Sequence, residues 1–100
     1  MNIGSFEIGQ GRTFVIAETC SNIIPHLNHL ESMVMAVRLS GADALKVQLY
    51  KAEHFPESER DSKRLTEFPR HLFPDLVSMC HANGLACGAS VFDEEAVDLP

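Results

Sequence analysis

The sequence has no apolar segment long enough to cross a membrane and no run of like charges. Its 8 lysine and arginine residues are scattered among 14 acidic ones, which gives a net charge of −6 and leaves no basic stripe. Nucleic acids and anionic membranes bind such stripes, so we expect neither as a partner. Residues 1–5 lack the charged and apolar regions of a signal peptide, and we therefore expect a cytoplasmic protein.

Cysteine and histidine are too few and too irregularly spaced to indicate a metal site. The three cysteines, Cys20, Cys80 and Cys87, are an odd number without CxxC spacing, which argues against a disulfide framework and a zinc site. Cys80 and Cys87 lie in apolar sequence and are predicted to be small core residues. His26 and His29 can share one helical turn, but a metal site usually needs three or four ligands. We predict no metal ligand in this chain.

The sequence does contain an alternation of strand-like and helix-like segments. Its 100 residues, 45% apolar and 22% charged, suit one small globular domain with a modest core. In order, we predict a hairpin of 6–8 with 13–18, a helix over 27–40, a strand over 44–49, a polar loop with one helical turn over 53–68, a helix over 74–83, a strand over 85–90 and a helix beginning at 94. Such alternation predicts an α/β fold with a parallel sheet and right-handed crossovers.

Local signals support several of these boundaries. The segment Gly9–Gly11 is typical of a turn, and Gly41 and Gly84 are plausible stops for the two helices. Asp93 is predicted to be the N-cap of the last helix. Residues 15–17 are apolar on both faces, which predicts that this strand is buried on both sides.

Lys46 and Gln48 are the most informative residues, because they place an ammonium and an amide on one face of an apolar strand. Side chains in a strand alternate between faces, so these two point the same way. A charge in such a setting is costly unless an anion meets it, which indicates an anion-binding site. Ligands of parallel α/β sheets gather at the carboxyl ends of the strands, where Glu18 and Ser90 also fall.

These polar residues also have structural interpretations. Glu18 can form a salt bridge with Lys46 across neighbouring strands. Ser90 can cap the helix that follows Asp93. Their convergence from three successive strands on one rim nevertheless favours a binding or catalytic site.

Several segments of the sequence resemble the N-terminal barrel of the sialic acid synthases. They are Phe14–Glu18, Asn22, Ser40–Ala52 and Ala89–Val97, in the order and at the intervals typical of these bacterial enzymes. The resemblance covers most of the chain from 14 to 97. In three places the chain departs from the family pattern: Ile23–Pro25 replaces a His-Asn-Gly loop, Ser90 replaces a threonine and Val91 replaces a proline.

The resemblance implies a (β/α)₈ barrel that condenses phosphoenolpyruvate with the open-chain aldehyde of an N-acyl amino sugar and releases inorganic phosphate. Lys46 would then pair with the phosphate or carboxylate of phosphoenolpyruvate. Gln48, Ser90 and Asn22 would bind substrate. Glu18 would be the catalytic residue, orienting the sugar or handling a proton. The resemblance also implies a divalent metal (manganese or magnesium) held by histidines of later strands, and a homodimer.

A barrel of this kind needs about 250 residues, so we expect residues 1–100 to be its N-terminal, incomplete part. The alternative is a non-catalytic module that binds anions or phosphate without turnover. A free-standing flavodoxin-like domain is less well supported, because the sequence has neither a GxGxxG motif nor a P-loop.

Overall fold

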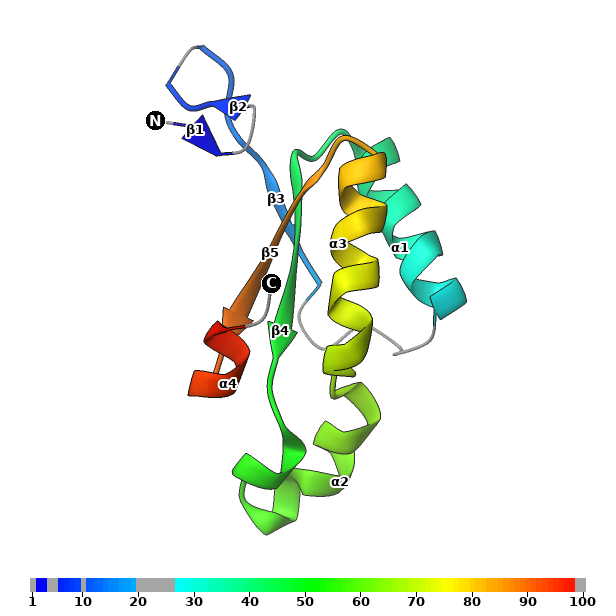
Figure 1. Ribbon diagram of the computed structural model, residues 1–100, viewed down its shortest axis with the longest axis vertical. Coiled ribbons are helices and arrows are strands. Elements are labelled where there is room, and N and C mark those ends of the chain that lie inside the picture. The colour runs from blue at the N-terminus through cyan, green and yellow to red at the C-terminus, as the bar shows by residue number, and fades with distance from the viewer. Residues whose placement is uncertain (1, 4–5, 10, 20–26, 99–100) are drawn as a thin grey trace.

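A parallel three-stranded sheet forms the centre of the chain (Figure 1). The computed structural model describes residues 2–3, 6–9, 11–19 and 27–98. The strands are β3 (Ile16–Glu18), β4 (Ala44–Leu49) and β5 (Ala86–Val91), in the order β3-β4-β5. β4 has its predicted bounds and β5 is shifted from them by one residue, so the α/β fold with parallel strands is confirmed.

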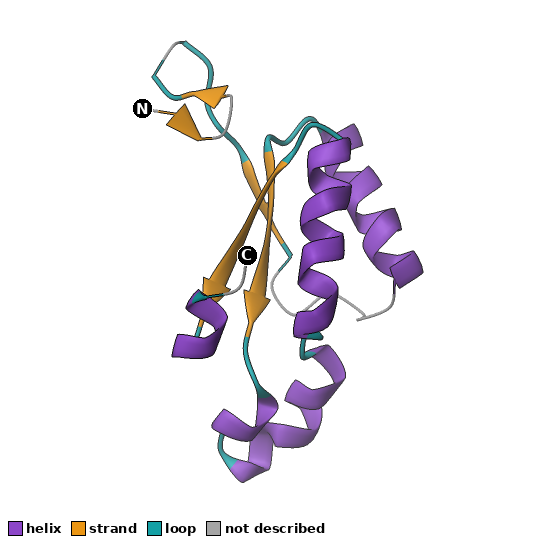
Figure 2. Cartoon of the chain, in the orientation of Figure 1, coloured by secondary structure: helices purple, strands orange, loops and turns teal. Residues whose placement is uncertain are grey.

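Two helices cover one face of this sheet, as Figure 2 shows. They are α1 (Leu27–Ser40) and α3 (Phe73–Ala82), and each lies in a crossover between two parallel strands. Both agree with the sequence prediction. Each is followed by a glycine with positive φ, Gly41 at +85° and Gly84 at +73°, a conformation that glycine adopts without steric cost.

The short helix α4 (Glu94–Val97) follows β5 and begins as predicted. Asp93 is its N-cap, because a carboxylate oxygen of Asp93 accepts a hydrogen bond of 2.8 Å from the backbone N–H of Ala96. None of the described helices is long and apolar enough to span a membrane.

The core lies between the sheet and the two long helices. Leu45, Val47 and Leu49 of β4 point toward α1 and α3 and are almost completely buried. They form one cluster with Leu30, Val34 and Val37 of α1 and Phe73, Leu76 and Cys80 of α3. Because side chains alternate along a strand, Lys46 and Gln48 lie on the opposite face of the sheet.

Cys80 and Cys87 lie in apolar surroundings, as predicted. Cys80 is fully buried, and Cys87 packs against the same core. A hydrogen bond with Cys80 and burial together raise the pKa of the Cys87 thiol, so this thiol stays protonated at neutral pH.

The predicted hairpin strand at 6–8 forms, but its partner precedes it in the chain and is not the segment 13–18. β1 (Asn2–Ile3) pairs antiparallel with β2 (Phe6–Glu7), and residues 13–15 belong to no strand. The backbone N–H of Val15 instead donates a 2.9 Å hydrogen bond to the carboxylate of Asp43. Asp43 is 28 residues away, so the local pattern of the sequence could not reveal this contact.

The prediction that residues 15–17 are buried on both sides is wrong. Val15 and Ile16 are 49% and 50% exposed. Within the described part of the chain, β3 is an edge strand, and α1 and α3 cover only one of its faces. Ala17, which points to that covered face, packs against the core.

The prediction of a loop with one helical turn over 53–68 is only partly right, because most of this segment is helical. It holds the short 3₁₀ helix η1 (Ala52–His54) and the helix α2 (Glu57–Thr66), and a second 3₁₀ helix, η2 (Arg70–Leu72), follows. α2 has no buried residue, so it lacks the apolar periodicity by which most helices are recognised. Its charges do suit a helix, with acidic residues in the first turn and basic residues in the last.

Candidate functional site

The predicted site residues on the three strands share one face of the sheet. The strand register places Glu18 of β3 beside Lys46 of β4, and Lys46 beside Gly88 of β5. Gln48 and Ser90 form the next row toward the carboxyl ends. Neighbouring strands are about 4.8 Å apart and these rows about 7 Å apart, so a small ligand can contact both rows. This is the face that α1 and α3 leave uncovered.

Glu18 and Lys46 form an ion pair, as the structural interpretation of Glu18 expects. The Oε2 atom of Glu18 lies 3.9 Å from Nζ of Lys46, and the two side chains are 38% and 39% exposed. So long and exposed a pair adds little stability, because water screens both charges. The ammonium of Lys46 can therefore meet an incoming anion while Glu18 stays beside it.

Gly88 leaves space next to Lys46. A Cβ atom built on Gly88 would lie 4.0 Å from Cγ of Lys46, which is ordinary van der Waals contact. A larger side chain would extend over the face that carries Lys46 and Ser90. An isolated glycine inside a strand is a known signal of close approach by a ligand or another backbone, and the sequence prediction did not use it.

Thr19 fixes the backbone beneath the site. Its backbone N–H and its hydroxyl both donate to the carbonyl oxygen of Lys46, each at 3.0 Å. Thr19 is a buried residue, so little water competes for these bonds. They continue the β3–β4 pairing past Glu18 and hold Lys46 in place. The prediction missed Thr19 because its partner is 27 residues away.

Asn22, the remaining predicted substrate-binding residue, lies outside the described residues, and so does His26. Among the residues that the structure describes, no three His, Cys, Asp or Glu side chains converge to hold a metal ion. The predicted site residues that the structure does describe offer a ligand one ammonium, one amide, one hydroxyl and one carboxylate.

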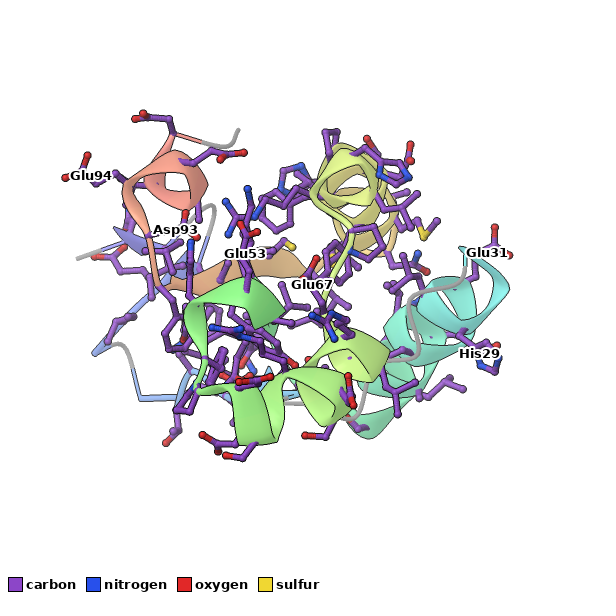
Figure 3. All side chains as sticks on the ribbon, turned by 90° about the horizontal axis from the view of Figure 1, so that it is seen from below. His29, Glu31, Glu53, Glu67, Asp93 and Glu94 are labelled. Carbon is purple, nitrogen blue, oxygen red and sulfur yellow. The ribbon has the colours of Figure 1, made fainter. Side chains whose placement is uncertain are left out.

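Charged side chains join the segments that follow β4 and β5 at this end of the sheet. Arg70 donates to both carboxylate oxygens of Asp93, at 2.9 and 2.6 Å, and Nζ of Lys51 lies 3.2 Å from Oε2 of Glu95. Figure 3 views the molecule from this end, with Asp93 beside α4. The bonds from Arg70, together with the one from the Ala96 backbone, hold the pKa of Asp93 well below its usual range.

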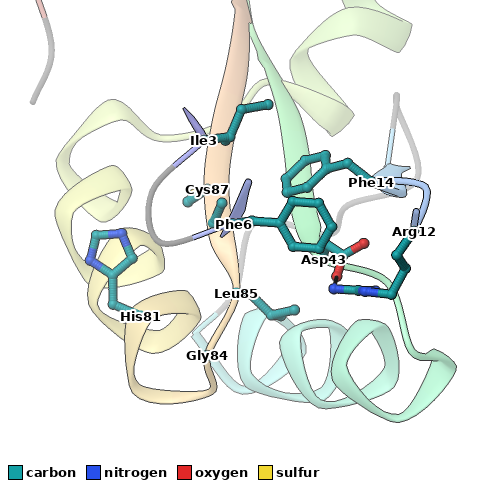
Figure 4. Close-up of a pocket in the computed structure, with 10 residues that line it drawn as sticks. Ile3, Phe6, Arg12, Phe14, Asp43, His81, Gly84, Leu85 and Cys87 are labelled. Atoms are coloured by element: carbon teal, nitrogen blue, oxygen red, sulfur yellow. Dashed lines mark hydrogen bonds and ion pairs between the residues drawn. The ribbon is translucent and has the colours of Figure 1, made fainter. Parts of the chain in front are cut away.

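A cavity of about 620 Å³ lies at the opposite, amino end of the strands (Figure 4). Phe6, Phe14 and the ion pair of Arg12 with Asp43 line it, and Nη2 of Arg12 is 2.8 Å from Oδ1 of Asp43. Arg12 also lies over the ring of Phe6, 4.3 Å from its centroid. Because Asp43 already compensates this guanidinium, we place the candidate anion site at the carboxyl end.

Comparison with known proteins finds similarity at the level of structure. No protein-family model and no curated protein sequence matches the chain. The N-acetylneuraminic acid (sialic acid) synthetase of Leptospira borgpetersenii serovar Hardjo-bovis, solved in complex with citrate, matches 99% of the chain with a TM-score of 0.88 and 25% identity. The spore coat polysaccharide biosynthesis protein SpsE of Bacillus subtilis matches 86% of it with a TM-score of 0.66 and 27% identity.

The chain spans only part of each of these proteins, 36% of the Leptospira chain and 25% of the Bacillus chain. The Leptospira match nevertheless extends over nearly all of the present chain, including the segments that carry the sequence motifs. In sequence motifs and in fold, this chain resembles the N-terminal part of the sialic acid synthases.

Proposed function

We propose that this chain is the N-terminal part of a (β/α)₈ barrel that condenses phosphoenolpyruvate with the open-chain aldehyde of an N-acyl amino sugar. The product is a sialic acid-type nonulosonate, and inorganic phosphate is released. The observation that carries the proposal is the placement of Glu18, Lys46, Gln48 and Ser90 on one face of a sheet. The fold that carries this sheet matches that of a sialic acid synthetase over 99% of the chain.

In this proposal, Lys46 binds the anionic substrate. Its ammonium pairs with the phosphate or the carboxylate of phosphoenolpyruvate, an attraction that strengthens when the site excludes water. The row formed by Gln48 and Ser90 supplies an amide and a hydroxyl toward the carboxyl ends. The Ser90 hydroxyl donates to the phosphate, and the Gln48 amide hydrogen-bonds the substrate.

Glu18 is the acid–base group of the proposal. Its carboxylate lies 3.9 Å from the ammonium of Lys46, so a substrate held by Lys46 is within its reach. There it can orient the amino sugar or exchange a proton with one of its hydroxyls.

The family resemblance further implies manganese or magnesium, which would polarise the sugar aldehyde. The described residues do not form a set of ligands for such an ion, and we derive no step through it. Three further proposals rest on the resemblance alone. They are the ligands of this metal ion, the substrate contact of Asn22 and the homodimer.

Binding of anions without turnover is the alternative. The described face favours it, because an ammonium and two hydrogen-bonding groups are enough to bind an anion. For acid–base chemistry this face offers a single carboxylate, that of Glu18. The two proposals share the role of Lys46 and differ in that of Glu18.

Substitution of Lys46 tests the shared step. We expect Lys46→Ala to abolish binding of phosphoenolpyruvate, measured by titration calorimetry, because the site loses its fixed positive charge. Arg38→Ala is the matched control: it also removes one positive charge, but from the last turn of α1 at the amino end of the sheet. Unchanged affinity of the Lys46→Ala protein would overturn the site assignment.

Substitution of Glu18 separates the enzyme from the binding module. In the complete enzyme, we expect Glu18→Gln to leave phosphoenolpyruvate binding intact and to reduce phosphate release in the presence of amino sugar. Unaltered turnover would reduce Glu18 to a structural ion pair. Binding of phosphoenolpyruvate by the unaltered protein without phosphate release would favour the binding module.

A further inference from the structure

The ion pair of Arg70 with Asp93 is unusually enclosed for this chain. The side chains are 12% and 16% exposed, and among the described ion pairs no other has both partners so well buried. Two parallel hydrogen bonds join them, from Nη1 to Oδ1 at 2.9 Å and from Nη2 to Oδ2 at 2.6 Å. Paired bonds of this kind fix both the distance and the orientation of the two groups.

This pair joins two segments that leave the sheet on the side of the candidate site. Arg70 belongs to η2, which lies in the connection from β4 to α3, and Asp93 lies between β5 and α4. The carboxylate of Asp93 also caps α4 through Ala96. Glu95 supports the same link, since it lies 3.8 Å from Arg70 and 3.2 Å from Lys51.

Ser90 lies close to the point at which the pairing of β5 with β4 ends. In the described sheet β5 pairs only with β4, and that pairing ends at Val91. Asp93, two residues further, is the next point at which the chain is held by defined hydrogen bonds. Release of Asp93 would therefore leave the end of β5, and the hydroxyl of Ser90, held only by the pairing with Gln48 and Leu49.

We propose that Arg70 is a positioning residue for the anion site: by holding Asp93, it keeps the Ser90 hydroxyl in register with Lys46 and Gln48. The inference rests on the proposed function, because it assumes that Ser90 contacts the bound anion. In this inference Arg70 acts through Asp93, because both of its terminal nitrogens donate to that carboxylate and its charge is already compensated.

A double-mutant cycle tests this role, with inorganic phosphate as the probe and calorimetry as the measurement. We expect Arg70→Met to weaken phosphate binding about fivefold when Ser90 is present and less than about twofold in the Ser90→Ala background. Arg70→Lys should recover part of the loss, because it keeps the charge but not the paired bonds. Arg64→Met is the control, since it breaks an exposed ion pair with Asp61 and should change nothing.

A second variant tests the inference independently, in case the Arg70→Met protein does not fold. Asp93→Ser keeps an N-cap for α4 but removes the partner of Arg70, so it should weaken phosphate binding to a similar extent. Equal losses with and without the Ser90 hydroxyl would show a general structural role and overturn the inference, as would the absence of any loss.

The outcome of Lys46→Ala distinguishes this inference from the proposed function. Loss of phosphate binding in Lys46→Ala, with none in Arg70→Met or Asp93→Ser, would refute the positioning role and leave the site intact. Phosphate binding that survives Lys46→Ala would overturn both.

Discussion

Asp43 shows how much one residue can organise at the amino end of the sheet. Its carboxylate accepts hydrogen bonds from the backbone N–H of Val15 and from Arg12. These two bonds lower the pKa of Asp43. The ionised form is therefore more stable in the folded chain than in the unfolded chain, and it ties the N-terminal segment to β4.

Acid should remove this contribution. The folded pKa of Asp43 lies below the unfolded value of about 3.8, so its stabilisation is complete above that pH and is lost as the pH falls through the lower, folded value. We expect Asp43→Asn to be less stable than the unaltered protein at pH 7 and to lose less stability on acidification below about pH 4. Urea unfolding across this pH range measures both effects.

Asp61→Asn is the matched control for this experiment. The Asp61 side chain is fully exposed and, among the residues that the structure describes, forms an ion pair with Arg64 alone, so its removal should leave the acid response unchanged. An Asp43→Asn protein with the acid response of the unaltered protein would show that the contacts of Asp43 do not stabilise the fold.

At the scale of elements, α2 is a helix held by contacts at its C-terminal end rather than by a buried face. The hydroxyls of Tyr50 and Thr66 form a hydrogen bond, and the backbone N–H of Ala52 donates to Glu67 at 2.6 Å. Nζ of Lys63 lies over the ring of Tyr50, 5.4 Å from its centroid. These contacts close the segment at its base, just beyond the end of β4.

Removal of one of these contacts should loosen α2 without disturbing the core. In Tyr50→Phe the ring stays but the hydrogen bond to Thr66 is lost, a net change of about 0.5–1.5 kcal/mol. We expect amide hydrogen exchange in α2 to accelerate about 2- to 12-fold while exchange in α3 stays the same.

Leu65→Ala provides the comparison within the same helix. Leu65 is an exposed residue of α2, so its truncation removes no buried contact, and α2 exchange should change little. Equal acceleration of exchange in α2 and α3 after Tyr50→Phe would contradict the idea that α2 opens on its own.

At the scale of the whole molecule, the stability of the described part of the chain depends on the cluster between β4 and the two long helices. Leu45 is completely buried at its centre. We expect Leu45→Ala to lower the free energy of unfolding by about 2–5 kcal/mol, because the lost apolar contacts and the cavity left behind both destabilise the folded chain. Leu39→Ala, at a position 79% exposed on α1, should change it by less than about 0.5 kcal/mol. Denaturant unfolding of the two variants measures the difference, and equal effects would show that the core lies elsewhere.

The elements that the sequence predicted correctly are those with an apolar pattern. α1 and β4 have their predicted bounds, because their buried residues recur at helix and strand spacing. α2 was mispredicted because it buries nothing, and β3 because its apolar residues do not face a helix on both sides. Whether an apolar residue is buried depends on which other elements pack against it. The sequence of a single strand does not specify those neighbours.

The residues of the candidate site likewise include some that the sequence predicts and one that it does not. Lys46 and Gln48 could be assigned to one face from strand alternation, and Glu18 and Ser90 to the same rim from parallel pairing. Thr19 could not be identified as the support of Lys46, because its hydrogen bonds reach a partner on another strand.

What the amino-acid sequence settled was the type of the elements with an apolar pattern and the face on which their polar residues lie, because neighbouring residues encode both through helix and strand periodicity. Only the tertiary structure decided which strands form the N-terminal hairpin, how α2 is held, and that Arg70 meets Asp93. These features join residues that are distant along the chain or follow no periodic pattern. Their energies appear only once the helices have packed against the sheet and brought the partners into contact.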